Sequence, residues 1–199
     1  MKKQFELVAL PLLCASAPCF AQAPDYSEPQ SSAGAHVAIV TGYDGSKFSG
    51  GGASDTLDGV NYGVKLGYDF SVTQYGLLGV EVEATNSTAK LDFGGGDTVK
   101  MGRDLYIGGR LKFDVSEAVA LYMKGGYTNA EVKATSAGLS AKATVDGWRL
   151  GAGAEFKLTS ELFGLVEYRY SNYGSYDDGL GTRVKFERHQ AIAGLGYRF

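Results

Sequence analysis

Twelve charged residues stand at alternate positions of strand-like segments in this 199-residue chain, and their types and spacing are the ones that could carry chemistry. Side chains two residues apart point to the same face of a β-strand, so these charges share one face. Opposite charges removed from water must be paired, whereas on a water-filled face they could line an ion path. The set comprises Lys65, Asp69, Glu81, Glu83, Asp104, Arg110, Lys112, Lys124, Arg149, Glu155, Glu167 and Arg169.

Metal binding would need ligands that converge on one point. The alternation places His36 and His189 on opposite faces of their strands, so the two histidines cannot share a metal. Several aspartates could bind calcium, but no calcium-loop spacing connects them, and solvated loop charge is favoured. These aspartates are Asp55, Asp58, Asp97, Asp177 and Asp178. We expect no metal and no cofactor.

The glycine-rich run Gly94–Lys100 superficially has the composition of a phosphate-binding loop. It lacks the Gly-Lys-Ser/Thr ending with which such a loop holds a phosphate and its cation. We therefore expect a flexible surface loop here.

The segments that must position the charges follow a repeat. On one parity their side chains are apolar, and on the other they are glycine or charged. Four of these segments end on phenylalanine at intervals of 43 residues, at Phe70, Phe113, Phe156 and Phe199. A period of 43 residues suits one β-hairpin with one long and one short connection.

A second strand returns after each of the first three phenylalanines, and residues 35–44 supply the first strand of the chain. The return strands are in phase, with Glu81, Lys124 and Glu167 at equivalent inward positions 43 residues apart. The total predicts an all-β fold, an eight-stranded antiparallel up-and-down transmembrane β-barrel. Its connections alternate between short turns and long loops: 71–75, 114–118 and 157–161 are short, and 45–59, 87–99, 134–144 and 172–184 are long.

The turn at 71–75 also predicts one specific contact. A symmetric hairpin end at this turn places Lys65 opposite Glu81 on the inward face, with a register slip of two residues left open. We expect these two side chains to pair, in a network with Glu83, Lys124 and Glu167.

The alternation fits two kinds of barrel. A soluble lipocalin-like barrel would turn its apolar face inward, whereas a transmembrane barrel turns that face toward lipid. The balanced charge of the glycine-rich face favours the transmembrane barrel, because charges in a narrow lumen must be paired. We expect Tyr168 to face lipid and Glu167 and Arg169 to face the lumen. Aromatic residues near both strand ends resemble two interfacial girdles: Phe70, Phe113, Phe156 and Phe199 at one end, and Tyr62, Trp148 and Tyr170 toward the other.

The start of the chain has the features of a secretory signal peptide. Lys2 and Lys3 precede an apolar run shorter than a transmembrane helix, and residues 21–23 have the small-x-small pattern of a cleavage site. We expect residues 1–23 to be removed, residues 24–33 to form a periplasmic N-terminal segment and residues 34–199 to form the barrel. Both cysteines, Cys14 and Cys19, fall in the leader, so the mature chain has no thiol.

Charge and hydropathy narrow the function classes. Beyond residue 23 the chain has 17 basic and 21 acidic residues, a net charge of −4. A nucleic-acid partner usually requires a basic patch, so none is expected. No apolar run of transmembrane-helix length follows the leader, so entry into a membrane would require a closed barrel, which leaves no backbone edge in lipid.

The chain resembles a known family in four features: the leader, the repeated glycine- and tyrosine-containing strands, EYRYSNYG at 167–174 and GLGYRF at 194–199. The family is the small opacity-type and OmpA-like porin family of the Gram-negative cell outer membrane, and the resemblance covers 24–199. It implies that Gly194, Tyr197 and Phe199 form the C-terminal signal read by the outer-membrane assembly machinery, although Ile192 replaces the polar residue usual near its start. We expect no peptidoglycan-binding domain after the barrel. Family membership implies architecture more firmly than activity.

Arg169-Tyr170-Ser171-Asn172 is similar to the His-x-Ser-Asn motif of outer-membrane lipid A deacylases. Arginine stands where histidine would deprotonate Ser171, and arginine cannot act as that base. We therefore expect a non-enzymatic barrel with a structural and surface-interaction role and a charge-plugged lumen. The alternatives are a narrow porin-like channel for ions or small solutes and, more distantly, a lipid A-modifying enzyme.

The expected partners follow from this placement. They are outer-membrane lipids and lipopolysaccharide, the assembly machinery during insertion, and a surface ligand held by the loops at 45–59, 87–99, 134–144 and 172–184.

Overall fold

The computed structural model describes residues 32–50, 53–136, 138–177 and 183–199. The expected signal peptide and most of the N-terminal segment lie outside these residues. No helix in the described part of the chain is long and apolar enough to cross a membrane. The strands are β1 (Gly34–Gly50), β2 (Ala53–Ser71), β3 (Gly76–Ser87), β4 (Lys90–Gly94), β5 (Asp97–Asp114), β6 (Val119–Ser136), β7 (Leu139–Lys157), β8 (Leu162–Asp177) and β9 (Arg183–Arg198).

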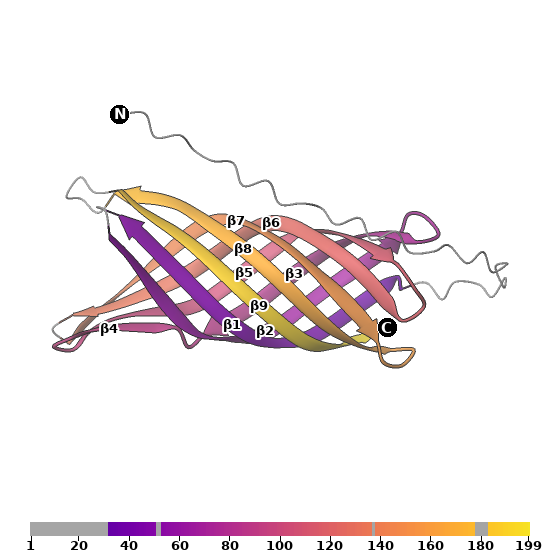
Figure 1. The fold of residues 1–199 in the computed structure, drawn as a ribbon, viewed down its shortest axis with the longest axis horizontal. Helices are drawn as coiled ribbons and strands as arrows, with labels where there is room; N and C mark the ends of the chain where they lie inside the picture. The colour runs from indigo at the N-terminus through magenta and orange to yellow at the C-terminus, as the bar shows by residue number, and fades with distance from the viewer. Residues whose placement is uncertain (1–31, 51–52, 137, 178–182) are drawn as a thin grey trace, which may run out of the picture.

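The strands close into one antiparallel barrel (Figure 1). β1 pairs with both β2 and β9, and β3 pairs with both β2 and β5, so the eight long strands form a closed ring. The short strand β4 pairs with β5 beyond the end of β3, so β3 and β4 together serve as one strand of the wall. The prediction of an eight-stranded antiparallel up-and-down barrel is confirmed.

The inner and outer faces of the wall are opposite in character. Lys65 is 1% exposed, whereas its neighbours Val64 and Leu66 are 44% and 51% exposed. Val166 and Tyr168 likewise lie on the outer face, on either side of a buried glutamate. Since the apolar side chains are outside and the charges inside, the soluble lipocalin-like alternative is wrong.

The tight turns lie at the end of the barrel that holds the C-terminus (Figure 1). The connections there are 72–75, 115–118 and 158–161, close to the predicted bounds. At the first of them, the backbone N–H groups of Val72 and Thr73 both donate to the carbonyl oxygen of Gly76, at 2.9 and 3.0 Å. This turn pairs Ser71 with Leu77 and carries β2 further than expected.

At the other end the strands continue through three of the predicted long loops. β1 and β2 are separated by residues 51–52 in place of 45–59, and β6 and β7 by residues 137–138 in place of 134–144. β8 and β9 likewise enter the predicted loop 172–184. These boundaries were wrong because the extended strands enclose an apolar cluster inside the barrel, made of Leu57, Ala89, Met101, Ala130, Tyr173 and Phe186.

The fourth predicted loop, 87–99, and the flexible run at Gly94–Lys100 form a β-hairpin instead. β4 pairs with the start of β5, so that Lys90 lies opposite Lys100 and Gly94 opposite Asp97. Gly95 and Gly96 have φ values of 63° and 93°. A two-residue turn with positive φ at both central positions suits glycine, which adopts this conformation without steric cost.

Candidate functional site: the charge network in the lumen

The inward charges form a continuous network inside the barrel. All twelve positions singled out in the sequence are at most 4% exposed, and each has an oppositely charged partner. The network has three tiers, which we name from the end with the tight turns. The lower tier is Asp69, Arg110, Lys112, Glu155 and Arg198; the middle tier is Lys65, Glu81, Glu83, Lys124, Glu167 and Arg169; the upper tier is Asp44, Asp104, Arg149 and Arg188.

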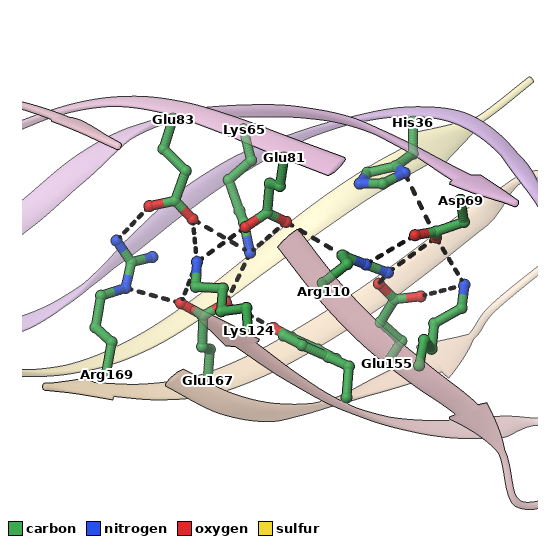
Figure 2. A network of polar contacts seen from close by, with 12 residues as sticks. His36, Lys65, Asp69, Glu81, Glu83, Arg110, Lys124, Glu155, Glu167 and Arg169 are labelled. Atoms are coloured by element: carbon green, nitrogen blue, oxygen red, sulfur yellow. Dashed lines mark hydrogen bonds and ion pairs between the residues drawn. The ribbon is translucent and has the colours of Figure 1, made fainter. Parts of the chain in front are cut away.

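Two ammonium groups stand among three carboxylates in the middle tier (Figure 2). Lys65 Nζ lies 2.7 Å from Glu167 Oε2, 3.2 Å from Glu81 Oε2 and 3.5 Å from Glu83 Oε1. Lys124 Nζ lies 2.9 Å from Glu81 and 2.8 Å from Glu167, and it also contacts Glu83. Each carboxylate is therefore shared between cations from different strands.

The contact between Lys65 and Glu81 is present, but the register differs from the simplest expectation. Lys65 lies directly opposite Glu83, and Glu81 lies opposite Gly67. The longer β2 strand at the 72–75 turn moves the pairing by two residues. Lys65 reaches Glu81 diagonally, because its long side chain spans the offset.

Arg169 joins the middle tier to the opposite wall. Its Nη1 atom lies 2.7 Å from Glu83 Oε2, and its Nε atom lies 2.8 Å from Glu167 Oε1. Arg169 belongs to β8 and Glu83 to β3, and these strands are four apart in either direction around the barrel. This ion pair therefore crosses the full width of the lumen.

The lower tier is centred on the guanidinium of Arg110. Its Nε atom lies 2.9 Å from Asp69 Oδ1, and its Nη2 atom lies 2.5 Å from Glu155 Oε1. Lys112 contacts the same two carboxylates at 3.0 and 3.4 Å, and Arg198 lies 2.9 Å from Glu155. His36 is buried beside this tier, with Nδ1 3.7 Å from Asp69 Oδ2.

The upper tier contains two residues that the sequence reading missed, Asp44 and Arg188. Arg188 donates to Asp44 through Nε and Nη2, each at 2.6 Å, and its Nη1 atom lies 2.6 Å from Asp104. Arg149 Nη2 lies 2.5 Å from the same Asp104 oxygen. A signal was available, because Asp44 has the parity of the inward His36 and Arg188 has the parity of the inward Arg198.

Two buried tyrosines separate the tiers and were also missed. The ring of Tyr122 lies beneath Arg110 at 4.9 Å, and its hydroxyl donates to Glu167 at 2.8 Å. The ring of Tyr106 lies beneath Lys124 at 4.7 Å. Glycine makes room for these rings, since a Cβ at Gly153 would stand 2.7 Å from the Tyr122 hydroxyl.

The three carboxylates of the middle tier could bind a metal cation, but the protein's own ammonium groups already occupy the space between them. Ligand oxygens of Glu81, Glu83 and Glu167 lie within 4.8 Å of one another. Lys65 and Lys124 already neutralise these three carboxylates, so a metal would have to displace buried ammonium groups. The two histidines do not converge, because His36 is buried while His189 is exposed and contacts the Tyr168 hydroxyl at 2.7 Å.

The described aspartates outside the network do not form a shared site. Asp55 is exposed, Asp58 accepts a hydrogen bond from Tyr43, and Asp97 closes the β4–β5 hairpin. The side chain of Asp177 and the whole of Asp178 lie outside the described part of the chain.

The possible nucleophile Ser171 is buried beside an arginine. Arg149 Nε donates to Ser171 Oγ at 2.8 Å. The preceding Arg169 is held by Glu83 and Glu167, and Asn172 donates to the Tyr170 hydroxyl at 3.1 Å. A guanidinium is a donor without an acceptor, so Arg149 cannot take a proton from this hydroxyl.

The aromatic residues expected to face lipid all lie on the outer face of the wall. At the end with the tight turns, Tyr197 packs edge-on against Phe199 with ring centroids 5.0 Å apart. At the other end, Trp148 packs against Tyr170 at 5.5 Å. The set is Phe70, Phe113, Phe156, Phe199, Tyr62, Trp148 and the half-buried Tyr170.

The C-terminal residues close the seam between the first and last strands. The backbone N–H of Phe199 donates to the carbonyl oxygen of Ala35 at 2.9 Å. Gly194 faces inward, and a Cβ there would stand 2.6 Å from the Ile39 carbonyl oxygen. Close packing of strands thus gives Gly194 a role in the fold itself.

A closed strand wall with an apolar exterior and a buried polar interior defines a transmembrane β-barrel of the outer-membrane class. The chain belongs to the outer membrane protein beta-barrel domain family, whose model matches residues 7–199. It is an outer-membrane protein.

Relatives and solved structures agree with this class. The 25 kDa outer-membrane immunogenic protein of Brucella abortus is 32% identical over 182 residues, which cover 89% of this chain and 82% of the relative. The 31 kDa outer-membrane immunogenic protein of Brucella melitensis is 26% identical over 199 residues, with 83% of each chain covered.

Two solved barrels show the same fold. Ail, the attachment invasion locus protein of Yersinia pestis, has a TM-score of 0.55 and 21% identity, covering 84% of this chain and 99% of that one. Neisserial surface protein A has a TM-score of 0.61 and 16% identity, covering 83% and 99%.

Proposed function

We propose that this outer-membrane barrel is non-enzymatic and closed, with a structural and surface-interaction role in the cell envelope. The observation that carries the proposal is the pair of ion contacts that cross the lumen. Glu83 contacts Arg169 at 2.7 Å, and Asp104 contacts Arg188 at 2.6 Å, in each case between strands on opposite walls. The interior of an eight-stranded barrel is just wide enough for its own side chains, so such pairs leave no room for a solute path.

The apolar cluster beyond the upper tier supports a closed lumen. Phe186 stacks on Phe48 with ring centroids 4.4 Å apart and on Tyr173 at 4.6 Å. An ion that passed through would have to leave water, part these rings and then break buried ion pairs. Each step removes charge from its partners, which is unfavourable in an interior of low dielectric constant.

Among the described residues, the side chain that hydrogen-bonds to the Ser171 hydroxyl is an arginine and not a base, which supports the non-enzymatic part of the proposal. Acyl transfer by a serine requires a group that accepts its proton, and Arg149 occupies that position. Burial of Ser171 behind the upper tier would also keep a lipid substrate away from its hydroxyl.

The proposed surface role rests on the strand connections opposite the tight turns. Family relatives are named outer-membrane immunogenic proteins, a description that fits exposed segments. We assign the surface-ligand contacts to the tips within 45–59, 87–99, 134–144 and 172–184. Lipids and lipopolysaccharide are the proposed partners of the outer wall, and the assembly machinery is the proposed partner of Gly194, Tyr197 and Phe199 during insertion.

Planar-bilayer recording of the refolded chain tests the closed lumen. Insertion is verified in the same lipids by quenching of Trp148, the single tryptophan of the chain, with brominated acyl chains. We expect inserted protein to give no steady current steps. Steady unitary steps from inserted protein would overturn the closed lumen and favour the narrow porin-like channel for ions or small solutes.

A further inference from the structure

Four lysines form a continuous row across the outer face of the wall. Lys90 on β4 pairs in register with Lys100 on β5, Lys100 with Lys133 on β6, and Lys133 with Lys142 on β7. Residues in direct register point to the same side of a sheet. With neighbouring strands about 4.8 Å apart, the row extends over about 15 Å.

A β-bulge adds a fifth cation to the same face. The register of β5 against β6 shifts between Met101 and Asp104. Bulges re-aim side chains, and this one brings both Lys100 and Arg103 to the exposed face although they are three residues apart. Arg103 therefore stands between the lysine row and the apolar belt below it.

Two outward carboxylates balance only part of this charge. Asp92 lies 2.9 Å from Lys90, and Glu131 lies 3.5 Å from Lys133 and 3.7 Å from Lys142. Like charges placed directly opposite each other destabilise a sheet. An anion bound along the row would relieve this repulsion.

An apolar groove lies on the side of the row toward the tight turns, across β2, β3, β5 and β6, so it shares β5 and β6 with the row. It has a volume of about 530 Å³ and is lined by Val64, Leu66, Val82, Leu105, Ile107 and Tyr127 among others. Ala84 also lines it. Along β5 the outward residues run from Ile107 and Leu105 to Arg103 and Lys100, so the groove leads directly to the cations.

Hydroxyl groups continue this gradient beyond the lysines. Thr98, Thr135 and Ser140 lie in one register row, and the last two hydroxyls are 3.0 Å apart. Along β5 the outer face thus changes from apolar to cationic to hydroxyl-bearing, whereas on β6 Asn129 and Glu131 stand between Tyr127 and Lys133. The same order of chemistry occurs in an amphiphile that carries acyl chains, phosphates and sugars.

We propose that this face binds a phosphorylated glycolipid of the outer leaflet. An acyl chain occupies the groove, the phosphates lie among Arg103, Lys100 and Lys133, and the sugars extend toward the hydroxyl row. The row faces sideways from the wall rather than along the barrel axis, which suits a lipid neighbour. This inference deepens the lipid contact of the proposed function and gives it a site.

The single tryptophan reports on this site, because Trp148 pairs in register with Tyr127 at the rim of the groove. The refolded chain in phosphatidylcholine vesicles is titrated with bis-phosphorylated lipid A that carries brominated acyl chains. We expect half-maximal quenching of Trp148 at a mole fraction about tenfold lower than for Lys100→Gln/Lys133→Gln, since two charge-assisted contacts are lost.

Matched variants separate the site from net charge. Lys47→Gln/Lys185→Gln removes two exposed lysines from β1 and β9, outside the row, and should titrate as the wild type does. Ala84→Leu fills the groove and should weaken quenching, whereas Ala152→Leu on the outer face of β7 should not. Dephosphorylated brominated lipid A should quench wild type and Lys100→Gln/Lys133→Gln alike.

Equal titration of wild type and Lys100→Gln/Lys133→Gln by the phosphorylated lipid would overturn the inference. So would a soluble sulfated glycan that binds through these lysines while the lipid does not accumulate, because the row would then serve a soluble polyanion. If the phosphorylated lipid does not accumulate and the bilayer recordings show no current steps, the lipid site is overturned and the closed lumen stands. Steady current steps would overturn the closed lumen, whatever the lipid titration shows.

Discussion

Arg188 and Asp104 meet at 2.6 Å across the full width of the barrel, from strands β9 and β5 that stand four strands apart in either direction. The Arg188 guanidinium also donates two parallel hydrogen bonds to the carboxylate of Asp44 on the neighbouring strand. Bidentate pairing of this kind fixes orientation as well as charge. Arg188 therefore connects the seam of the barrel to its opposite wall.

Replacement of Arg188 by alanine should lower the free energy of unfolding in bilayers by about 3–5 kcal/mol, because it leaves buried carboxylates without a partner. Urea titration of protein folded into vesicles measures this loss. Lys185→Ala removes an exposed cation from the same strand, paired with Glu187 at 2.8 Å, and should cost about 0–1 kcal/mol. A loss for Arg188→Ala no larger than that of Lys185→Ala would contradict the upper tier.

Lys65 and Glu81 should show energetic coupling. Glu81→Ala leaves cations of the middle tier in excess, and Lys65→Ala leaves carboxylates in excess, so each single change is destabilising. The double variant restores the balance and should lose less than the sum, by about 0.5–3 kcal/mol. Losses that simply add in the same urea titration would mean that the contact has no energetic weight.

Val166→Arg tests the lipid-facing wall. Val166 is 49% exposed and lies between Ala154 and Ala193 on the neighbouring strands. An arginine at this outward position should weaken folding into bilayers by about 2–4 kcal/mol. Ser140→Arg, on the exposed hydroxyl row beyond the belt, is the control and should change stability little. Equal stability of the two variants would refute the assigned position of the membrane.

Gly153→Ala should be destabilising by about 1–3 kcal/mol, as expected for overpacking. A Cβ at this position would stand 2.4 Å from the Val166 carbonyl oxygen and 2.7 Å from the Tyr122 hydroxyl. Gly109→Ala is the matched control, because its nearest neighbour would be the Gly79 carbonyl oxygen at 3.8 Å. Identical midpoints in a urea titration would show that the tyrosine layer tolerates the added carbon.

The barrel could be read from the chain because its two periodicities agree. Alternation within strands sets which side chains share a face, and the 43-residue repeat sets which strands share a phase, so the closed wall follows from sequence. The far ends of the strands could not be read in this way. Glycine and polar residues near Gly50 and Ser136 resemble loops, and what extends the strands is the enclosed cluster around Phe186, which involves residues distant in sequence.

The sequence predicted most of the residues that form the charge network, but beyond the contact between Lys65 and Glu81 it did not predict which of them pair with each other. Parity identified Lys65, Glu81 and Arg169 as inward residues, but their partners depend on a register that one turn shifts by two residues. Arg188 and Asp44 were missed because they stand near predicted strand ends, where the alternation had few neighbours to support it. The row that contains Lys100 and Lys133 appears only when four strands are placed in register.

The contact between Asp44 and Arg188 joins residues 144 positions apart, and it can form only when the last strand meets the first. The entropy of closing so long a loop opposes early formation of this contact, so we expect it to form after most of the wall. Interactions absent from the folding transition state govern the rate of unfolding more than the rate of folding. We therefore expect that weakening the contact between Asp44 and Arg188 leaves the rate of insertion nearly unchanged but raises the rate of unfolding, so that each folded barrel has a shorter lifetime.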